Sequence, residues 1–211
     1  MGEMTDVTAR IRNPRGQGDR LRDDLIEAAL VLMSEHGDPE AVSIRAVAKA
    51  AGVTPTAAYR HFEDRDALVV AACEANFEQF AAFLLPYYAE LDDPFERLLG
   101  AGRGYLDFAE GDPGRYRVLF SNPITQSVKA DAWPDMLSGD TAFAQLISLV
   151  QGCITAGAKP QTDDAVYLSF QLWTWIHGIV DLRITHPGMD WPDAWRMFVD
   201  VTAALHLDRP G

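Results

Sequence analysis

The chain has 211 residues, of which 48% are hydrophobic, and it carries a formal net charge of −13. This length and apolar content indicate a globular protein with one large core or two smaller ones. No run of about 20 apolar residues occurs and no hydrophobic signal region precedes the first helix, which predicts a cytoplasmic protein with no membrane partner.

The two cysteines, Cys73 and Cys153, lie within apolar helical patterns rather than at metal-ligand spacing. Buried small hydrophobic residues are the favoured interpretation, and a thiol sensor is the alternative. No phosphate loop and no metal-ligand constellation is evident, so neither a cofactor nor a metal site is predicted.

The negative charge is distributed unevenly along the chain. Between Arg10 and Phe62, eight Lys and Arg residues stand against seven acidic residues, a net charge of +1. Since nucleic acids are bound mainly through phosphate neutralisation, the acidic balance argues against DNA binding only for the remainder of the chain. We expect modest non-specific affinity for DNA in this region and a strong dependence on base contacts.

Residues 1–18 are polar and rich in glycine and arginine, which predicts a disordered basic arm. Arg10, Arg12 and Arg15 could reach a minor groove or DNA phosphates, and an unused solubilising tail is the alternative. A first helix is predicted from Asp19 to about His36. Its apolar residues share one face that should pack against the next two helices: Leu21, Leu25, Ala28, Ala29 and Leu32.

The stretch 43–62, SIRAVAKAAGVTPTAAYRHF, predicts two short helices joined by a tight turn. Ser43 is a good N-cap for the first helix. Gly52 permits the left-handed backbone of a C-cap after it. Thr54 caps the second helix, and Pro55 occupies the first helical position, where its missing N–H costs nothing.

The second of these helices presents hydrogen-bond donors beside small residues. Its donor-rich side chains are Thr54, Thr56, Tyr59, Arg60 and His61. Ala57 and Ala58 let the backbone approach another surface closely, which suits the DNA major groove. We assign base reading to Thr54, Thr56 and Ala57, and phosphate contact to Tyr59 and Arg60; half-buried packing for Tyr59 and a solvated face for Arg60 are the alternatives.

Asp64 is predicted to cap a fourth helix that continues to a break at Pro86. Arg65 lies in its first turn, where a positive charge opposes the helix dipole. This position suggests an outside partner such as a phosphate, and a plain surface arginine is the alternative.

After Pro86 the capping signals are those of an all-helical domain. A helix is predicted over 94–111 after an Asp-Pro cap, and a shorter one follows 112–113 and ends near Asn122. Residues 124–139 have no clear period and are predicted to form a loop. A further helix runs from about Phe143 to its end at Gly157.

Two long helices, 162–187 and 191–207, end the chain, and they begin at Thr162 or Asp163 and at Asp190. The first carries a second apolar row that widens its apolar stripe beyond one face: Leu172, Trp175, Ile176 and Ile179. Such a helix is expected to be buried on two sides. One side can be its own core and the other a second copy, which predicts a homodimer.

The run 43–68, which includes AxAAGVTPTAAYRHFEDRDAL in this order and spacing, resembles the DNA-binding domain of TetR-family transcriptional regulators. The Trp-x-Trp-Ile-His-Gly run 173–178 and the run 116–120 resemble the Trp-His-Gly (WHG) type of TetR C-terminal domain. The resemblance implies an all-α fold of about nine helices. It places a three-helix helix-turn-helix domain at 19–66, followed at 67–211 by a helical effector-binding and dimerisation domain whose last two helices form the dimer interface.

The resemblance implies a sequence-specific repressor that binds palindromic double-stranded DNA as a homodimer. Two readers about 34–36 Å apart would meet successive major grooves. The expected DNA-binding residues are Ser43, Arg45, Thr54, Pro55, Thr56, Ala57, Tyr59, Arg60, His61 and Arg65.

A helical domain of this size in a regulator indicates a sensor of a small-molecule effector. Candidates to line a cavity are aromatic or aliphatic with one or two polar groups: Phe80, Phe83, Leu84, Tyr105, Phe108, Tyr116, Trp173 and His177. Core packing is the alternative for each, and for His177 a hydrogen bond to a neighbour. With few charged groups inside, the effector is expected to be largely apolar or aromatic and to release the operator.

Two other functions compete with this interpretation. An enzyme could use His177 and Asp181, four residues apart, as base and orienter, but no activated serine or cysteine is evident near them, so no enzyme activity is predicted. A helical interaction or carrier protein with a non-functional DNA reader is the alternative that the acidic charge favours.

Overall fold

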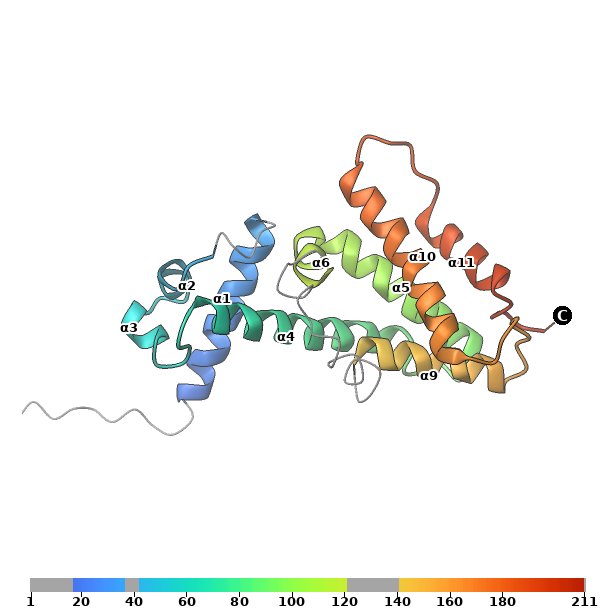
Figure 1. The fold of residues 1–211 in the computed structure, drawn as a ribbon, viewed down its shortest axis with the longest axis horizontal. Coiled ribbons are helices and arrows are strands. Elements are labelled where there is room, and N and C mark those ends of the chain that lie inside the picture. The colour runs from blue at the N-terminus through green and yellow to red at the C-terminus, as the bar shows by residue number, and fades with distance from the viewer. Residues whose placement is uncertain (1–16, 37–41, 121–140, 211) are drawn as a thin grey trace, which may run out of the picture.

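The computed structural model describes residues 17–36, 42–120 and 141–210. Within these ranges it contains nine α-helices, one short 3₁₀ helix and no strand, which confirms the all-α prediction. Figure 1 shows the long helix α4 (Arg65–Leu84) running along the molecule, with α1–α3 gathered at one end and α10 and α11 at the other. The predicted arm, apart from residues 17 and 18, and the predicted loop 124–139 lie outside the described residues.

The N-terminal helices are α1 (Gln17–His36), α2 (Ile44–Ala50) and α3 (Pro55–Ala58). The predicted caps of α2, α3 and α4 are confirmed: Ser43 Oγ accepts from the Ala46 amide at 3.2 Å, Thr54 Oγ1 from Ala57 at 3.3 Å, and Asp64 Oδ1 from Ala67 at 2.8 Å. Gly52 has φ +70°, the left-handed conformation predicted for the turn.

Helix α1 forms the centre of the N-terminal core. Of the predicted apolar row, Leu25 and Ala29 are fully buried, whereas its other members are half-buried. Residues outside that row are buried as well: Ile26, Leu30 and Met33. They are covered because α1 contacts α2, α4 and α6. Helix α1 also begins at Gln17, two residues before the predicted cap at Asp19.

The C-terminal helices are η2 (Leu85–Tyr87), α5 (Pro94–Gly111), α6 (Pro113–Phe120), α9 (Ala142–Thr155), α10 (Ala165–Thr185) and α11 (Ala194–Ala204). Asp93 caps α5, its Oδ1 accepting from the Phe95 amide at 2.8 Å and the Glu96 amide at 3.1 Å. The cap of α10 is Asp164, one or two residues after the predicted start.

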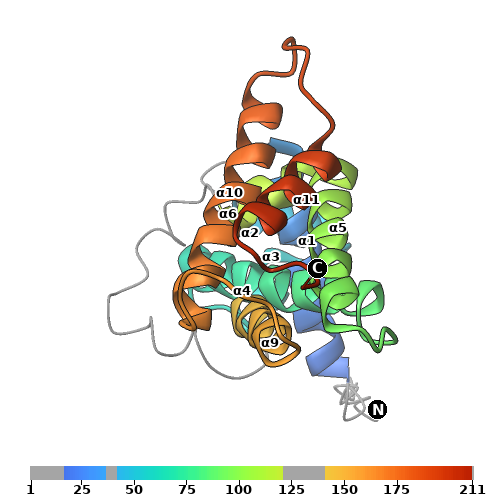
Figure 2. The ribbon, with the colours of Figure 1, turned by 90° about the vertical axis from the view of Figure 1, so that its right-hand side faces the viewer.

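The predicted start of the last helix at Asp190 is wrong, because Asp193 caps α11 and residues before it form the connection from α10. Two hydrogen bonds hold this connection out of the helix. The Trp191 indole donates to the His186 carbonyl at 2.9 Å, and Arg183 donates to the Pro192 carbonyl at 2.9 Å. Figure 2 shows the connection projecting beyond the ends of α10 and α11.

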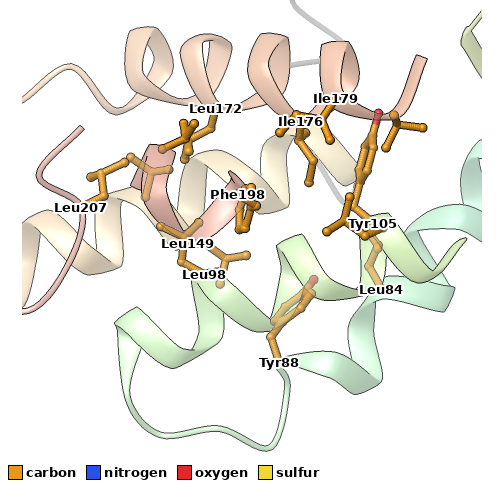
Figure 3. Close-up of a cluster of buried hydrophobic side chains, with 14 of the residues drawn as sticks. Leu84, Tyr88, Leu98, Tyr105, Leu149, Leu172, Ile176, Ile179, Phe198 and Leu207 are labelled. Carbon is orange, nitrogen blue, oxygen red and sulfur yellow. The ribbon is translucent and has the colours of Figure 1, made fainter. Parts of the chain in front are cut away.

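The C-terminal core lies between α5, α9, α10 and α11 (Figure 3). Leu172, Ile176 and Ile179 of the predicted second row of α10 are buried in it. Trp175, the fourth member, is 54% exposed and faces away from this core. The row therefore faces two surfaces, and the described residues cover one of them.

The segment Arg65–Tyr87 is long and apolar enough to cross a membrane by length and composition alone. Half of its most apolar window is buried inside the fold, as in the core helix of a globular domain.

Candidate DNA-binding surface and effector site

The helix-turn-helix motif presents its predicted DNA-binding residues at the α2–α3 end of the molecule (Figure 1). Six of them are exposed, and a seventh, Tyr59, is 54% exposed: Ser43, Arg45, Thr54, Pro55, Thr56 and Arg60. Ala57, His61 and Arg65 are half-buried. Ala58 and Phe62 are buried in the N-terminal core and anchor this surface from below. A large exposed tyrosine beside an exposed arginine is a surface that packing alone does not explain.

The caps define which hydroxyls are available to a partner. Ser43 and Thr54 use an oxygen lone pair to accept a backbone amide, and each hydroxyl proton remains able to donate, as a contact to a phosphate requires. Thr56 is exposed and is not used as a cap. Its hydroxyl can therefore both donate and accept, which suits it best of the three for reading a base edge.

Arg65 has partners within the chain. Its Nε donates to the Val42 carbonyl at 2.9 Å, and its guanidinium pairs with Asp66 at 2.8 Å. These contacts tie the start of α4 to the segment that precedes α2. The position of Arg65 in the first turn of α4 is thus accommodated internally, and its contact with DNA stays a prediction.

Two cations of this surface were not among the predicted site residues. Lys49 is exposed in the last turn of α2. Arg22 of α1 lies with its guanidinium 5.4 Å from the centre of the Phe62 ring. Lys49 could have been identified from sequence, because it is a cation in the last turn before the turn glycine Gly52. The contact of Arg22 with Phe62 could not, because it joins residues 40 positions apart.

Six of the eight predicted effector residues form one aromatic cluster in the C-terminal half. Its ring pairs include Phe80–Phe108 at 4.9 Å, Phe80–Tyr105 at 5.5 Å, Tyr116–His177 at 5.7 Å and Trp173–His177 at 5.8 Å. Leu84 is buried in the same core. Phe83 is 40% exposed and packs its ring against Phe108 at 5.4 Å, on the outer side of the cluster.

Phe120 is the member of this cluster that the sequence analysis missed. Its ring centre lies within 4.9 to 6.4 Å of six other rings, those of Phe77, Phe80, Tyr105, Tyr116, Trp173 and His177. Its spacing of four from Tyr116 places both on one face of α6, which was the available signal.

A polar network lies inside the cluster. The hydroxyls of Tyr105 and Tyr116 lie 3.1 Å and 2.9 Å from His177 Nδ1 and 3.5 Å from each other. In Figure 3, Tyr105 extends from α5 with its hydroxyl toward α10. The network confirms that His177 is hydrogen-bonded to neighbours.

Burial is the main influence on all three titrating groups. It raises the pKa of Tyr105 and of Tyr116 well above the ordinary value, so both phenols stay protonated. Burial lowers the pKa of His177 from its ordinary value of 6.5, and the nearby Asp181 charge opposes this shift. The imidazole is therefore neutral at pH 7.

Helix α6 connects the cluster to the DNA-binding end. Tyr116 and Leu119 belong to the C-terminal core, whereas Val118 belongs to the N-terminal core. At the start of α6, Ser34 Oγ of α1 donates to Asp112 Oδ1 at 3.0 Å. Further along, Arg115 pairs with Glu27 of α1 at 2.8 Å, and its carbonyl accepts from the buried Asn76 side chain of α4 at 3.2 Å.

Two open grooves lie on the N-terminal half, one of about 580 Å³ between α1 and α4 and one of about 520 Å³ between α1 and α2. Half of the residues that line the first groove are acidic, and they come from both helices: Asp23, Asp24, Glu27, Glu74 and Glu78. Neither groove includes a predicted effector residue, so a cavity at the aromatic cluster stays a prediction.

The sequence matches the models of two known protein families. Residues 25–72 match the family model of bacterial regulatory proteins of the tetR family, and residues 98–205 match that of the tetracyclin repressor-like C-terminal domain. The chain belongs to the TetR family. It is therefore a DNA-binding transcription regulator and not an enzyme, and the second match includes the WHG-type runs at 116–120 and 173–178.

Two curated relatives and one solved structure illustrate the similarity. The chain is 29% identical over 189 residues to the nucleoid occlusion factor SlmA of Marinobacter nauticus, covering 82% of this chain and 91% of SlmA. It is 26% identical over 121 residues to the transcriptional activator FasR of Mycolicibacterium smegmatis, covering 57% of this chain and about half, 55%, of FasR. A protein of unknown function from Rhodococcus sp. RHA1 has the same fold, with a TM-score of 0.71, 20% identity and coverage of 94% and 97%.

Proposed function

We propose that this TetR-family regulator represses transcription by binding a palindromic operator as a homodimer, and that a small, largely apolar or aromatic effector releases it. The observation that carries the proposal is the surface of the motif. Thr56 of α3, and Tyr59 and Arg60 directly after its last residue, are exposed, whereas Ala58 and Phe62 anchor this segment in the core. A helix so anchored can enter a major groove without unfolding any of the core.

Substitutions on this surface test the proposal and separate base reading from phosphate contact. Arg60→Ala should weaken binding to all sequences and lower the salt dependence by about one phosphate contact. Thr56→Ala should keep its affinity for scrambled DNA but lose affinity for the operator, which lowers the preference for one base at one position by a factor of about 5 to 100. Gel shifts measure both effects, with scrambled DNA as one probe and, as the other, an operator obtained by selecting bound duplexes from a random DNA pool. A folded Arg60→Ala protein with unchanged affinity would favour the alternative of a non-functional reader.

The dimer is supported by the uncovered face of α10. Tyr167, Trp175 and Leu182 are 55%, 54% and 46% exposed. They lie along one side of the helix, next to the buried row at 172, 176 and 179. Exposed apolar side chains gathered along one helix indicate a protein contact, and a second copy brings a second reader as the palindrome requires.

The dimer is tested by Trp175→Glu, with Val31→Glu as the matched control because Val31 is 45% exposed on α1. Solution mass should fall to that of a monomer for Trp175→Glu alone. The same variant should lose affinity for the full operator more than for a single half-site. A dimeric Trp175→Glu protein would show that the interface lies elsewhere.

Effector release is supported by the position of α6 between the aromatic cluster and α1. A ligand that moves Tyr116 or Phe120 moves the helix whose other side holds Ser34 and Glu27, so one event biases both regions. Repression rather than activation is tested with a reporter gene behind the selected operator. FasR is a transcriptional activator, so increased reporter expression in the presence of the protein would reverse the sign proposed here.

A further inference from the structure

The network around His177 favours one position for its proton. Nδ1 faces two phenol hydroxyls, at 2.9 Å from Tyr116 and 3.1 Å from Tyr105, and the two hydroxyls are 3.5 Å apart. If Nδ1 carries no proton, it accepts one phenol proton, and the other phenol donates to the first phenol oxygen. Both protons then have acceptors.

The other tautomer leaves a donor unpaired. If Nδ1 carried the proton, it would donate to one phenol oxygen, and only one of the two phenol protons would have an acceptor among the described residues. Tyr105 and Tyr116 are 7% and 1% exposed, so water cannot easily take the remaining proton. An unpaired buried hydroxyl is costly.

His177 therefore presents an N–H at Nε2, on the ring edge opposite to the tyrosines. None of the described residues hydrogen-bonds Nε2. The imidazole ring is bordered by Phe120 at 4.9 Å and Trp173 at 5.8 Å, and Trp173 continues to Phe143 at 5.6 Å. All four of these side chains are half-buried, which distinguishes this aromatic row from the fully buried core beside it. A partly open aromatic row with one oriented polar group is the usual composition of a small-molecule site.

Asp181 limits the charge that such a ligand can carry. It is one turn from His177 on α10, and its negative charge acts on His177, Tyr105 and Tyr116. A carboxylate placed at Nε2 would be repelled by this charge. A carbonyl oxygen would take the hydrogen bond without that repulsion.

We propose that His177 Nε2–H recognises an uncharged acceptor, the carbonyl oxygen of a ketone, ester or amide, on an aromatic effector that lies along Phe120, Trp173 and Phe143. This rests on the proposed function, because it specifies the effector of the same site. It divides aromatic compounds into three classes: hydrocarbons bind weakly, neutral carbonyl compounds bind better, and carboxylates do not gain from their oxygen.

Three probes that share one ring system test this: naphthalene, 2-acetonaphthone and 2-naphthoate, titrated into the DNA-free full chain with affinity measured by tryptophan fluorescence and calorimetry. The ketone should bind about three- to tenfold more tightly than the hydrocarbon, the range of one neutral hydrogen bond, and the carboxylate should not exceed the hydrocarbon. His177→Phe keeps an aromatic ring and removes the donor, so it should bind all three equally. His186→Phe, on the exposed end of α10, should keep the preference of the wild type.

Tightest binding of the carboxylate, a ketone preference that survives in folded His177→Phe, or failure of all three probes to bind would each overturn the proposal. Operator binding measured on the same preparation separates this failure from failure of the proposed function. A protein that binds its operator but shows no ketone preference refutes only the effector class. A protein that binds no DNA sequence and yet shows the preference refutes the regulator and leaves the His177 site standing.

Discussion

Gly114, where α6 crosses α1, is the position at which the coupling between the two halves can be tested most sharply. A Cβ at this residue would lie 2.4 Å from the Ser34 carbonyl oxygen and 2.4 Å from Ser34 Oγ. The carbonyl is part of the α1 backbone and cannot rotate away. Reaching the ordinary contact distance of 3.4 Å requires the two helices to separate locally by about 1 Å.

The magnitude follows from what this separation disturbs. Overpacking at a close helix contact costs about 1–3 kcal/mol. The Ser34–Asp112 hydrogen bond at 3.0 Å lengthens as well, worth about 1 kcal/mol, whereas the Arg115–Glu27 pair adds little because Glu27 is 53% exposed. Helix propensity offsets up to about 1 kcal/mol. Gly114→Ala should therefore lower the free energy of unfolding by about 1–3 kcal/mol.

Gly111→Ala is the matched control, because a Cβ there would meet no other packed side chain or helix among the described residues within 4 Å. Urea unfolding followed by circular dichroism, at one fixed protein concentration, compares the two variants. Gly111→Ala should match or slightly exceed the wild type, and Gly114→Ala should also show a weaker effect of effector on operator affinity. A Gly114→Ala protein as stable as Gly111→Ala would refute the assignment of a tight α1–α6 contact.

Three further predictions concern single groups. Asp64→Ala removes the cap that accepts from Ala67 at 2.8 Å and should cost about 1 kcal/mol of stability, whereas Asp64→Asn, which can also cap, should stay near the wild type; equal losses would contradict the cap. Burial raises the pKa of the Cys153 thiol to about 11. The contribution of the protonated thiol to the free energy of unfolding is therefore complete below the ordinary pKa of 9.0 and is lost as the pH rises toward 11. Disulfide-exchange labelling of Cys153 at pH 8 should be slow until urea is added, and rapid labelling of the native protein would favour the thiol sensor. Because the pKa of His177 is lowered in the folded state, the unfolded chain binds the proton first, and the free energy of unfolding should fall as the pH drops below 6.5. Folded His177→Phe should show a shallower fall between pH 7.5 and 5.5. Identical pH profiles for the two proteins would contradict the lowered pKa.

The helix starts were predictable from sequence wherever the signal is local. Ser43, Thr54, Asp64 and Asp93 each cap a helix through an amide two or three residues away, so the residue type and its position carry the information. Gly52 is a local signal of the same kind, since glycine adopts a left-handed backbone because it has no Cβ.

The start of the last helix was not predictable in this way. Asp190 and Asp193 are both acceptable caps, and the choice depends on Trp191 reaching His186 and on Arg183 reaching Pro192 from the end of α10. These contacts are made by side chains of the connection and the preceding helix. The spacing of apolar residues in the last helix therefore gives no information about these contacts.

The burial of α1 was only partly predictable for a related reason. One apolar face was expected, but Leu30 and Met33 are buried too because α6 arrives from residues 113–120 to cover a second face. A contact between elements about 80 residues apart leaves no periodic signal in either of them.

In the candidate site, the residue types were predictable and their connections were not. Tyr105, Tyr116 and His177 were recognised as aromatic or polar residues on apolar faces, but that two hydroxyls converge on one imidazole nitrogen depends on how α5, α6 and α10 cross. Phe120 was missed because it is the last residue of α6, where its helical face is least certain from sequence.

The most direct measurement is a selection of bound duplexes from a random DNA pool, made together with the solution mass of the protein. The account predicts a dimer and a palindromic consensus with half-site centres about 10 bp apart, so that two α3 surfaces meet successive major grooves. A folded protein that enriches no sequence, with and without 2-acetonaphthone, would contradict the claim that the exposed Thr56–Arg60 surface reads DNA.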